Sequence, residues 1–185
     1  MELIACGAEP ILVVDALCVE RDPTGNEIIK GVRDEAALAG LDPEMAVTGS
    51  TEENISTCQT GIGITAIGVA ERSELRLGKA SIGDVLVCIG VPKVGNEVTL
   101  DDPEIVDLRA VRALANIEWV HEIVPVGSRG IRAEAWDLAE TSGLGTRVEP
   151  SVHLDLDKSA GPATCVVAAC DGARWQELSA ITGKP

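Results

Sequence analysis

The stretch EPILVVDALCV, from Glu9 to Val19, decides the first part of the fold. It is apolar and rich in β-branched residues, and the turn-forming sequence DPTGN follows it at Asp22–Asn26, so we expect a buried strand. Asp15 interrupts this run, and an isolated charge is costly to bury. Asp15 therefore either points to solvent at the edge of the strand or faces a polar site.

Helical and strand-like patterns alternate after this strand. The apolar positions from Asn26 to Leu41 follow helical spacing, which predicts a helix. Strands are expected at Met45–Thr48, Gln59–Glu71 and Asp84–Gly90. The first half of the chain is therefore predicted to contain a strand, a helix and three further strands.

The sequence VPKVGN, from Val91 to Asn96, has the Pro and Gly of a linker and no periodicity. We expect a domain boundary there, giving domains 1–91 and 92–185. The second domain is predicted to contain these elements in order: a helix at Pro103–Ala115, a strand at Val120–Val124, a helix at Ile131–Ser142, a strand at Ala163–Ala169 and a helix at 172–181. Such alternation predicts a layered α/β or α+β fold.

Composition excludes several classes of protein. The chain has 185 residues, of which 45% are hydrophobic, so a sizeable core is available. Its net charge of −15 disfavours nucleic acid as a partner. No apolar run approaches the roughly 20 residues of a membrane span, and the N-terminus lacks a secretory pattern. The six cysteines lie mostly in apolar stretches, which predicts core thiols and a cytoplasmic protein.

Short motifs occur in the order seen in one known family. They are GAEP at Gly7–Pro10, TGSTEE at Thr48–Glu53, GDVLVCIG at Gly83–Gly90 and the pair Gly95-Asn96. Together they resemble the aminoimidazole ribonucleotide (AIR) synthase family, which includes thiamine-monophosphate kinase, selenophosphate synthetase and hydrogenase-maturation dehydratases. The sequence VGSRG, Val126–Gly130, is similar to a glycine-rich helix start in the hydrogenase-maturation branch.

The resemblance implies a two-domain fold and an activity. The N-terminal sheet-and-helix domain would form a barrel in a homodimer, here without the family's first strand and glycine-rich segment, and the C-terminal domain would be an α/β sandwich. The implied activity is ATP-dependent phosphorylation or activation of a small molecule with ATP and Mg²⁺, and the narrower resemblance is to α-ribazole kinases of cobamide (cobalamin) salvage. The alternative is a shortened, non-catalytic member that acts as a dimeric ligand-binding or assembly module.

The same resemblance selects site residues, none of which is assigned a catalytic role. Those expected to bind the nucleotide are Gly49, Ser50, Thr51, Asn96, Ser128, Arg129 and Gly130. The metal candidates are Asp15, Glu52 and Glu53, because Ser50 occupies the position of the family's metal-binding acid.

Local alternatives remain open for several of these positions. Gly49–Glu53 also fits an ordinary polar turn, Asn96 a plain turn, and Arg129 a surface salt bridge. Asp101 and Asp102 precede Pro103 and are expected to cap the helix that we predict to begin there.

Overall fold

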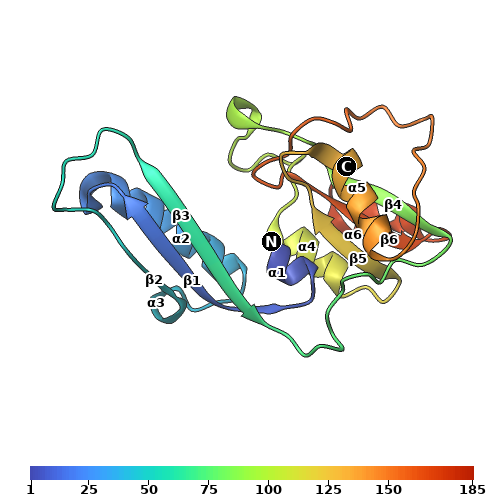
Figure 1. The fold of residues 1–185 in the computed structure, drawn as a ribbon, viewed down its shortest axis with the longest axis horizontal. Coiled ribbons are helices and arrows are strands. Elements are labelled where there is room, and N and C mark those ends of the chain that lie inside the picture. The colour runs from blue at the N-terminus through green and yellow to red at the C-terminus, as the bar shows by residue number, and fades with distance from the viewer. The chain divides into compact units, whose positions relative to one another are not determined.

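The computed structural model describes residues 1–185, and they form two compact units. The small unit consists of Ala8–Ala70, and the large unit of Met1–Gly7 together with Glu71–Pro185. The chain is a mixed α/β protein, as predicted (Figure 1). None of its helices combines the length and the apolar character needed to cross a bilayer.

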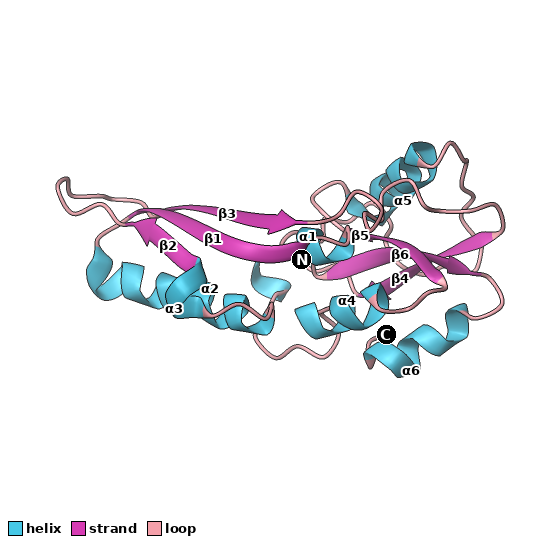
Figure 2. Ribbon diagram, turned by 90° about the horizontal axis from the view of Figure 1, so that it is seen from below, coloured by secondary structure: helices cyan, strands magenta, loops and turns pink.

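The small unit is a three-stranded sheet in the order β2-β1-β3. The central strand β1 (Glu9–Cys18) pairs in parallel with β2 (Val47–Ser50) and antiparallel with β3 (Gly61–Val69). Two parallel neighbours need a crossover connection, and this connection contains α2 (Asn26–Leu38) and α3 (Pro43–Ala46). Both helices lie on one face of the sheet (Figure 2).

The other face of this sheet has no covering element within the unit (Figure 2). From Asp15 to Cys18 the burial alternates, with Asp15 and Leu17 buried and Ala16 and Cys18 exposed. The edge strand β3 is exposed over most of its length, including four large apolar side chains: Ile62, Ile64, Ile67 and Val69.

The large unit has a second antiparallel sheet in the order β4-β6-β5. Strands β4 (Asp84–Gly90) and β5 (Val120–Pro125) flank β6 (Cys165–Asp171), in which every residue but the last is buried. Helix α5 (Gly130–Thr141) covers one face of the sheet. The opposite face is covered by three helices (Figure 2): α1 (Glu2–Ala5), α4 (Leu108–Ala115) and α6 (Leu178–Thr182).

Strand β4 belongs to a different sheet from the one that its place in the sequence suggested. Its seven residues pair with β6, and the compact units divide near residues 7 and 70, whereas the sequence boundary was set after Val91. These strands are far apart in the sequence, and local sequence patterns do not show which distant strands pair. The assignment of 1–91 and 92–185 to the two domains of the family stays a prediction.

The predicted helix at Pro103–Ala115 is shorter than expected. Helix α4 begins at Leu108, where the Asp107 side chain accepts a hydrogen bond from the Ala110 N–H at 2.8 Å. The prediction that Asp101 and Asp102 cap this helix is therefore wrong. Asp102 instead accepts from the Glu104 N–H at 2.9 Å.

The prediction that the cysteines are core residues holds for only part of the set. Cys165 and Cys170 are buried, whereas Cys18 and Cys58 are exposed, and all six are free thiols. A hydrogen bond with the Cys88 thiol, together with burial, raises the pKa of Cys165 far above its usual range. The two buried thiols are therefore uncharged core residues.

Candidate functional site

The parallel pairing of β1 with β2 brings Asp15 opposite Gly49. A Cβ atom added to Gly49 would lie 1.6 Å from Oδ1 of Asp15 and 2.1 Å from its carbonyl oxygen. Only glycine leaves room for the carboxylate here. The glycine at 49 therefore leaves the space that the Asp15 carboxylate occupies.

A pocket of about 380 Å³ opens beside this pair, wholly within the small unit. Its walls come from β1, the turn η1 (Arg21–Gly25), α2, the whole of β2 and the residue after it. The lining residues are Asp15, Arg21, Ile29, Arg33, Val47, Thr48, Gly49, Ser50 and Thr51. The pocket therefore gathers Asp15 with three of the predicted nucleotide-binding residues.

Asp15 is 4% exposed and has no hydrogen bond or ion pair through its side chain. Neither carboxylate oxygen of Asp15 is completely shielded from solvent, so the small accessible surface of this residue includes the carboxylate. A buried charge without a partner is costly in a folded protein. The structure does not fit the interpretation that Asp15 points to solvent, and the interpretation that it faces a polar site stays a prediction.

Two arginines face the same pocket, and the sequence analysis missed both. Nη1 of Arg33 lies 3.1 Å from Oε1 of Glu44, while the Arg33 Nε is buried without a partner. Arg21 makes no ion pair. No motif marks these arginines, because they meet Asp15 only after the crossover folds α2 onto the sheet.

The predicted metal ligands Glu52 and Glu53 do not line this pocket. Oε1 of Glu52 accepts from the N–H groups of Asn54 at 2.6 Å and Ile55 at 3.1 Å, which stabilises the loop after β2. Glu53 is exposed. No group of three His, Cys, Asp or Glu side chains in the chain lies close enough to hold a metal ion.

The remaining predicted site residues lie in the large unit. Asn96 is exposed in the turn η2 (Gly95–Glu97), and Ser128 is exposed before α5. Arg129 pairs with Asp137 and lies 3.7 Å from Glu134, so it matches the surface salt bridge that the sequence left open. Gly130 starts α5 at a φ of +80°, and a Cβ there would lie 2.7 Å from the Leu156 carbonyl oxygen.

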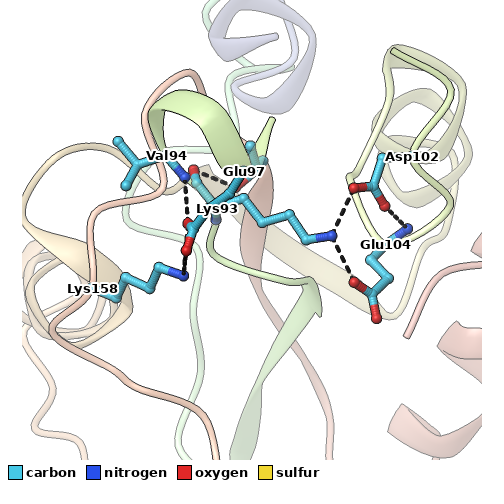
Figure 3. Close-up of polar contacts among 7 residues, drawn as sticks. Lys93, Val94, Glu97, Asp102, Glu104 and Lys158 are labelled. Atoms are coloured by element: carbon cyan, nitrogen blue, oxygen red, sulfur yellow. Dashed lines mark hydrogen bonds and ion pairs between the residues drawn. The ribbon is translucent and has the colours of Figure 1, made fainter. Parts of the chain in front are cut away.

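The loop around Asn96 contains a network of ion pairs (Figure 3). The Lys93 ammonium lies 2.7 Å from Asp102 and 2.6 Å from Glu104. The hydrogen bond from Lys93 lowers the pKa of Asp102, and a hydrogen bond from Lys158 lowers the pKa of Glu97. These charges are already paired, which distinguishes this loop from the pocket in the small unit.

Comparison with protein families identifies the N-terminal part of the chain. Residues 1–70 match the family "AIR synthase related protein, N-terminal domain". A search of curated protein sequences gave no match.

Solved structures share the fold over nearly the whole chain. PurL of Thermotoga maritima complexed with ADP aligns with a TM-score of 0.65 and 20% identity, covering 98% of this chain and 32% of PurL. HypE in a HypE–HypF complex aligns with a TM-score of 0.60 and 19% identity, covering 96% of this chain and 68% of HypE. Escherichia coli HypE, a hydrogenase maturation protein, aligns with a TM-score of 0.62 and 16% identity, covering 96% of this chain and 64% of that HypE. The chain therefore spans about a third of PurL and about two thirds of HypE.

Proposed function

We propose, from the premise that residues 1–70 belong to the AIR synthase-related N-terminal domain family, that this chain takes part in ATP-dependent phosphorylation or activation of a small molecule. The observation that carries the proposal is the pocket beside Asp15, which lies within the matched segment. The proposal is supported by PurL of Thermotoga maritima, which this chain resembles over about a third of its length and which has been solved with ADP, with ATP and with AMPPCP. The acceptor is open, and α-ribazole is one candidate.

The residues around the pocket fit a phosphate group. Arg21 and Arg33 offer guanidinium donors, which suit phosphate oxygens, and Ser50 and Thr51 offer hydroxyls. Gly49 keeps the backbone bare next to Asp15. Phosphoryl transfer depends largely on positioning and charge neutralisation, and these are the contributions that such residues make.

The residues fit Mg²⁺ less well. The three predicted ligands are not gathered, because Asp15 alone lines the pocket and Glu52 is bonded to the loop that follows it. Asn96, Ser128, Arg129 and Gly130 belong to the other compact unit, and a role for them in nucleotide binding stays a proposal.

Calorimetry with a non-hydrolysable ATP analogue tests the proposal. The full chain is titrated with the analogue in the presence and absence of Mg²⁺, and saturable binding is expected. An Arg33→Gln variant should bind the analogue at least tenfold more weakly, whereas Arg147→Gln, whose arginine is exposed on the large unit, should bind it as the wild type does. Absence of binding at millimolar analogue would remove the proposal.

The second candidate is a non-catalytic ligand-binding or assembly module. The observation that favours it is that Asp15 is the one acid lining the pocket, while Glu52 is hydrogen-bonded to the loop that follows β2. Turnover of ATP by these 185 residues would refute this candidate. Binding of the analogue without turnover would support it over the enzyme.

We also propose a homodimer formed through β3. A long apolar edge strand is an unstable feature unless another chain covers it, and Ile62 and Ile64 on β3 are 57% and 48% exposed. Light scattering should give twice the monomer mass for the wild type and the monomer mass for an Ile62→Lys/Ile64→Lys variant. Ile55→Lys, at a 71% exposed loop position, is the matched control and should remain dimeric.

A further inference from the structure

The Asp15 carboxylate lacks a hydrogen-bond donor. It is buried, it reaches the pocket, and no protein group donates to it. Burial of an ionised carboxylate is stabilised by donors or by an opposite charge. The pocket therefore has a position at which a ligand would supply the missing donor.

A divalent cation suits this position poorly. Asp15 is the only acid among the nine lining residues, and two arginines face the same space. Two guanidinium charges against one carboxylate repel a cation and attract an anion. A neutral hydroxyl or an amine on an organic molecule can donate to Asp15 without that penalty, because an anionic group elsewhere on the molecule meets the arginines.

Arg33 has a free donor that an anionic group could bind. Its Nη1 contacts Glu44, but the Nε–H has no acceptor although it is buried. Leaving a buried donor unpaired is costly, so an anionic acceptor that bonded to this N–H would be bound more tightly. Arg21 adds a second guanidinium with no ion pair on the same pocket.

We propose that this pocket binds a small organic anion that also carries a hydroxyl or amine, with Asp15 accepting from that donor and Arg21 and Arg33 binding the anionic group. A volume of about 380 Å³ suits a compact molecule of this class. Gly49 leaves room for the carboxylate beside β2. The inference does not depend on the proposed function, because the molecule that it describes contains no nucleotide.

Matched probes test this inference without nucleotide. The ¹H–¹⁵N spectrum of the full chain is titrated with glycerol 3-phosphate, with glycerate and with propyl phosphate, which lacks the hydroxyls. The amide signals of Thr48–Thr51 should shift. Glycerol 3-phosphate or glycerate should bind at least tenfold more tightly than propyl phosphate, and the tighter of the two identifies the anionic group as phosphate or carboxylate. Equal binding of hydroxylated and hydroxyl-free probes, or binding of none, would overturn the inference.

Two variants locate the effect. Asp15→Leu, which has a similar size and no acceptor, should abolish the preference for the hydroxylated probe and bind propyl phosphate at least as tightly as the wild type does. Asp34→Asn, at an exposed residue of α2 whose carboxylate pairs with Lys30, should leave both unchanged. A preference that survives Asp15→Leu would overturn the inference. It would also be overturned if Mg²⁺ alone shifted the Thr48–Thr51 signals in the wild type but not in Asp15→Leu.

The outcomes separate this inference from the proposed function. Probe binding without any binding of the ATP analogue would remove the proposed function and leave the pocket assignment standing. Binding of the ATP analogue, together with equal binding of hydroxylated and hydroxyl-free probes, would remove the pocket assignment and leave the proposed function standing.

Discussion

The two units of the chain each bury one carboxylate, and they treat it in opposite ways. In the large unit, Glu122 on β5 is 2% exposed and accepts from the N–H groups of Gly78 at 3.0 Å, Lys79 at 2.8 Å and Ala80 at 3.3 Å, with the Ser142 hydroxyl at 3.4 Å. In the small unit, Asp15 is 4% exposed and accepts from nothing. The satisfied acid holds a loop onto its sheet. The acid without a hydrogen bond lines the pocket, where we propose that a ligand donates to it.

Glu122→Ala should have the largest effect on stability. It leaves the N–H groups of Gly78 and Lys79 without an acceptor, while the Ala80 N–H keeps only the Ser142 hydroxyl oxygen at 3.1 Å, so the free energy of unfolding should fall by about 3 kcal/mol. Urea denaturation followed by circular dichroism measures this loss. Glu118→Ala, at an exposed acid shortly before β5, should change stability by less than about 0.5 kcal/mol. Equal losses of stability in the two variants would show that the hydrogen bonds to Glu122 do not stabilise the fold.

Gly49→Ala should destabilise the small unit by about 2 kcal/mol. The added methyl group would overlap both the carboxylate and the carbonyl oxygen of Asp15, and the carbonyl cannot move without disturbing β1. Gly31→Ala is the matched control: it lies within α2, has nothing within 4 Å of the added atom, and should stabilise the helix by about 0.5–1 kcal/mol. A wild-type-like denaturation curve for Gly49→Ala would contradict the close approach of the two strands at Asp15.

Asp15→Asn should leave the unfolding free energy unchanged or raise it by about 1 kcal/mol, in contrast to Glu122→Ala. Removing a buried charge that has no partner relieves a desolvation cost, and it breaks no hydrogen bond. The same urea titration at pH 7, without ligand, checks the sign. A loss of 2 kcal/mol or more would mean that Asp15 is structural, and the contrast between the two acids would fail.

The pair Lys93–Asp102 should have the smallest effect and the clearest dependence on pH. Lys93 lowers the pKa of Asp102, so the pair stabilises the fold above about pH 3.9, the ordinary value for aspartate, and the contribution is lost as pH falls through the lower folded value. The difference in urea midpoint between wild type and Lys93→Met should be complete at pH 7 and shrink towards pH 2. Lys79→Met, at an exposed lysine without an ion pair, should show no such trend. A Lys93 effect that is equal at both pH values would exclude the electrostatic explanation.

Local sequence signals predicted the elements well where packing agreed with them. The strand Asp84–Gly90 was predicted with its observed bounds, and the run from Glu9 contains β1. The helix expected from Pro103 failed at its start because the Asp107 side chain caps the chain later, while Asp102 is held by Lys93 and the Glu104 N–H. Side-chain hydrogen bonds between neighbouring loops decide such boundaries, and periodicity does not report them.

The candidate site was predicted only in part. The turn Gly49–Thr51 and Asp15 were selected from the sequence, and the structure brings them to one pocket. Arg21 and Arg33 carry no motif, and Glu52 and Glu53 looked suited to a metal until their positions away from the pocket were known. The sequence identified which groups are charged, but the orientation of each group depends on the fold.

The sequence by itself determined the family resemblance, the α/β class and the oddity of an acid inside an apolar strand. Those features depend on residue order and local spacing, which the chain carries whether or not it is folded. Only the tertiary structure decided that β4 joins β6, that Glu122 is satisfied and that Asp15 faces a pocket with two arginines. These outcomes depend on contacts between residues far apart in the chain, and such contacts exist only once the strands have paired and the helices have packed.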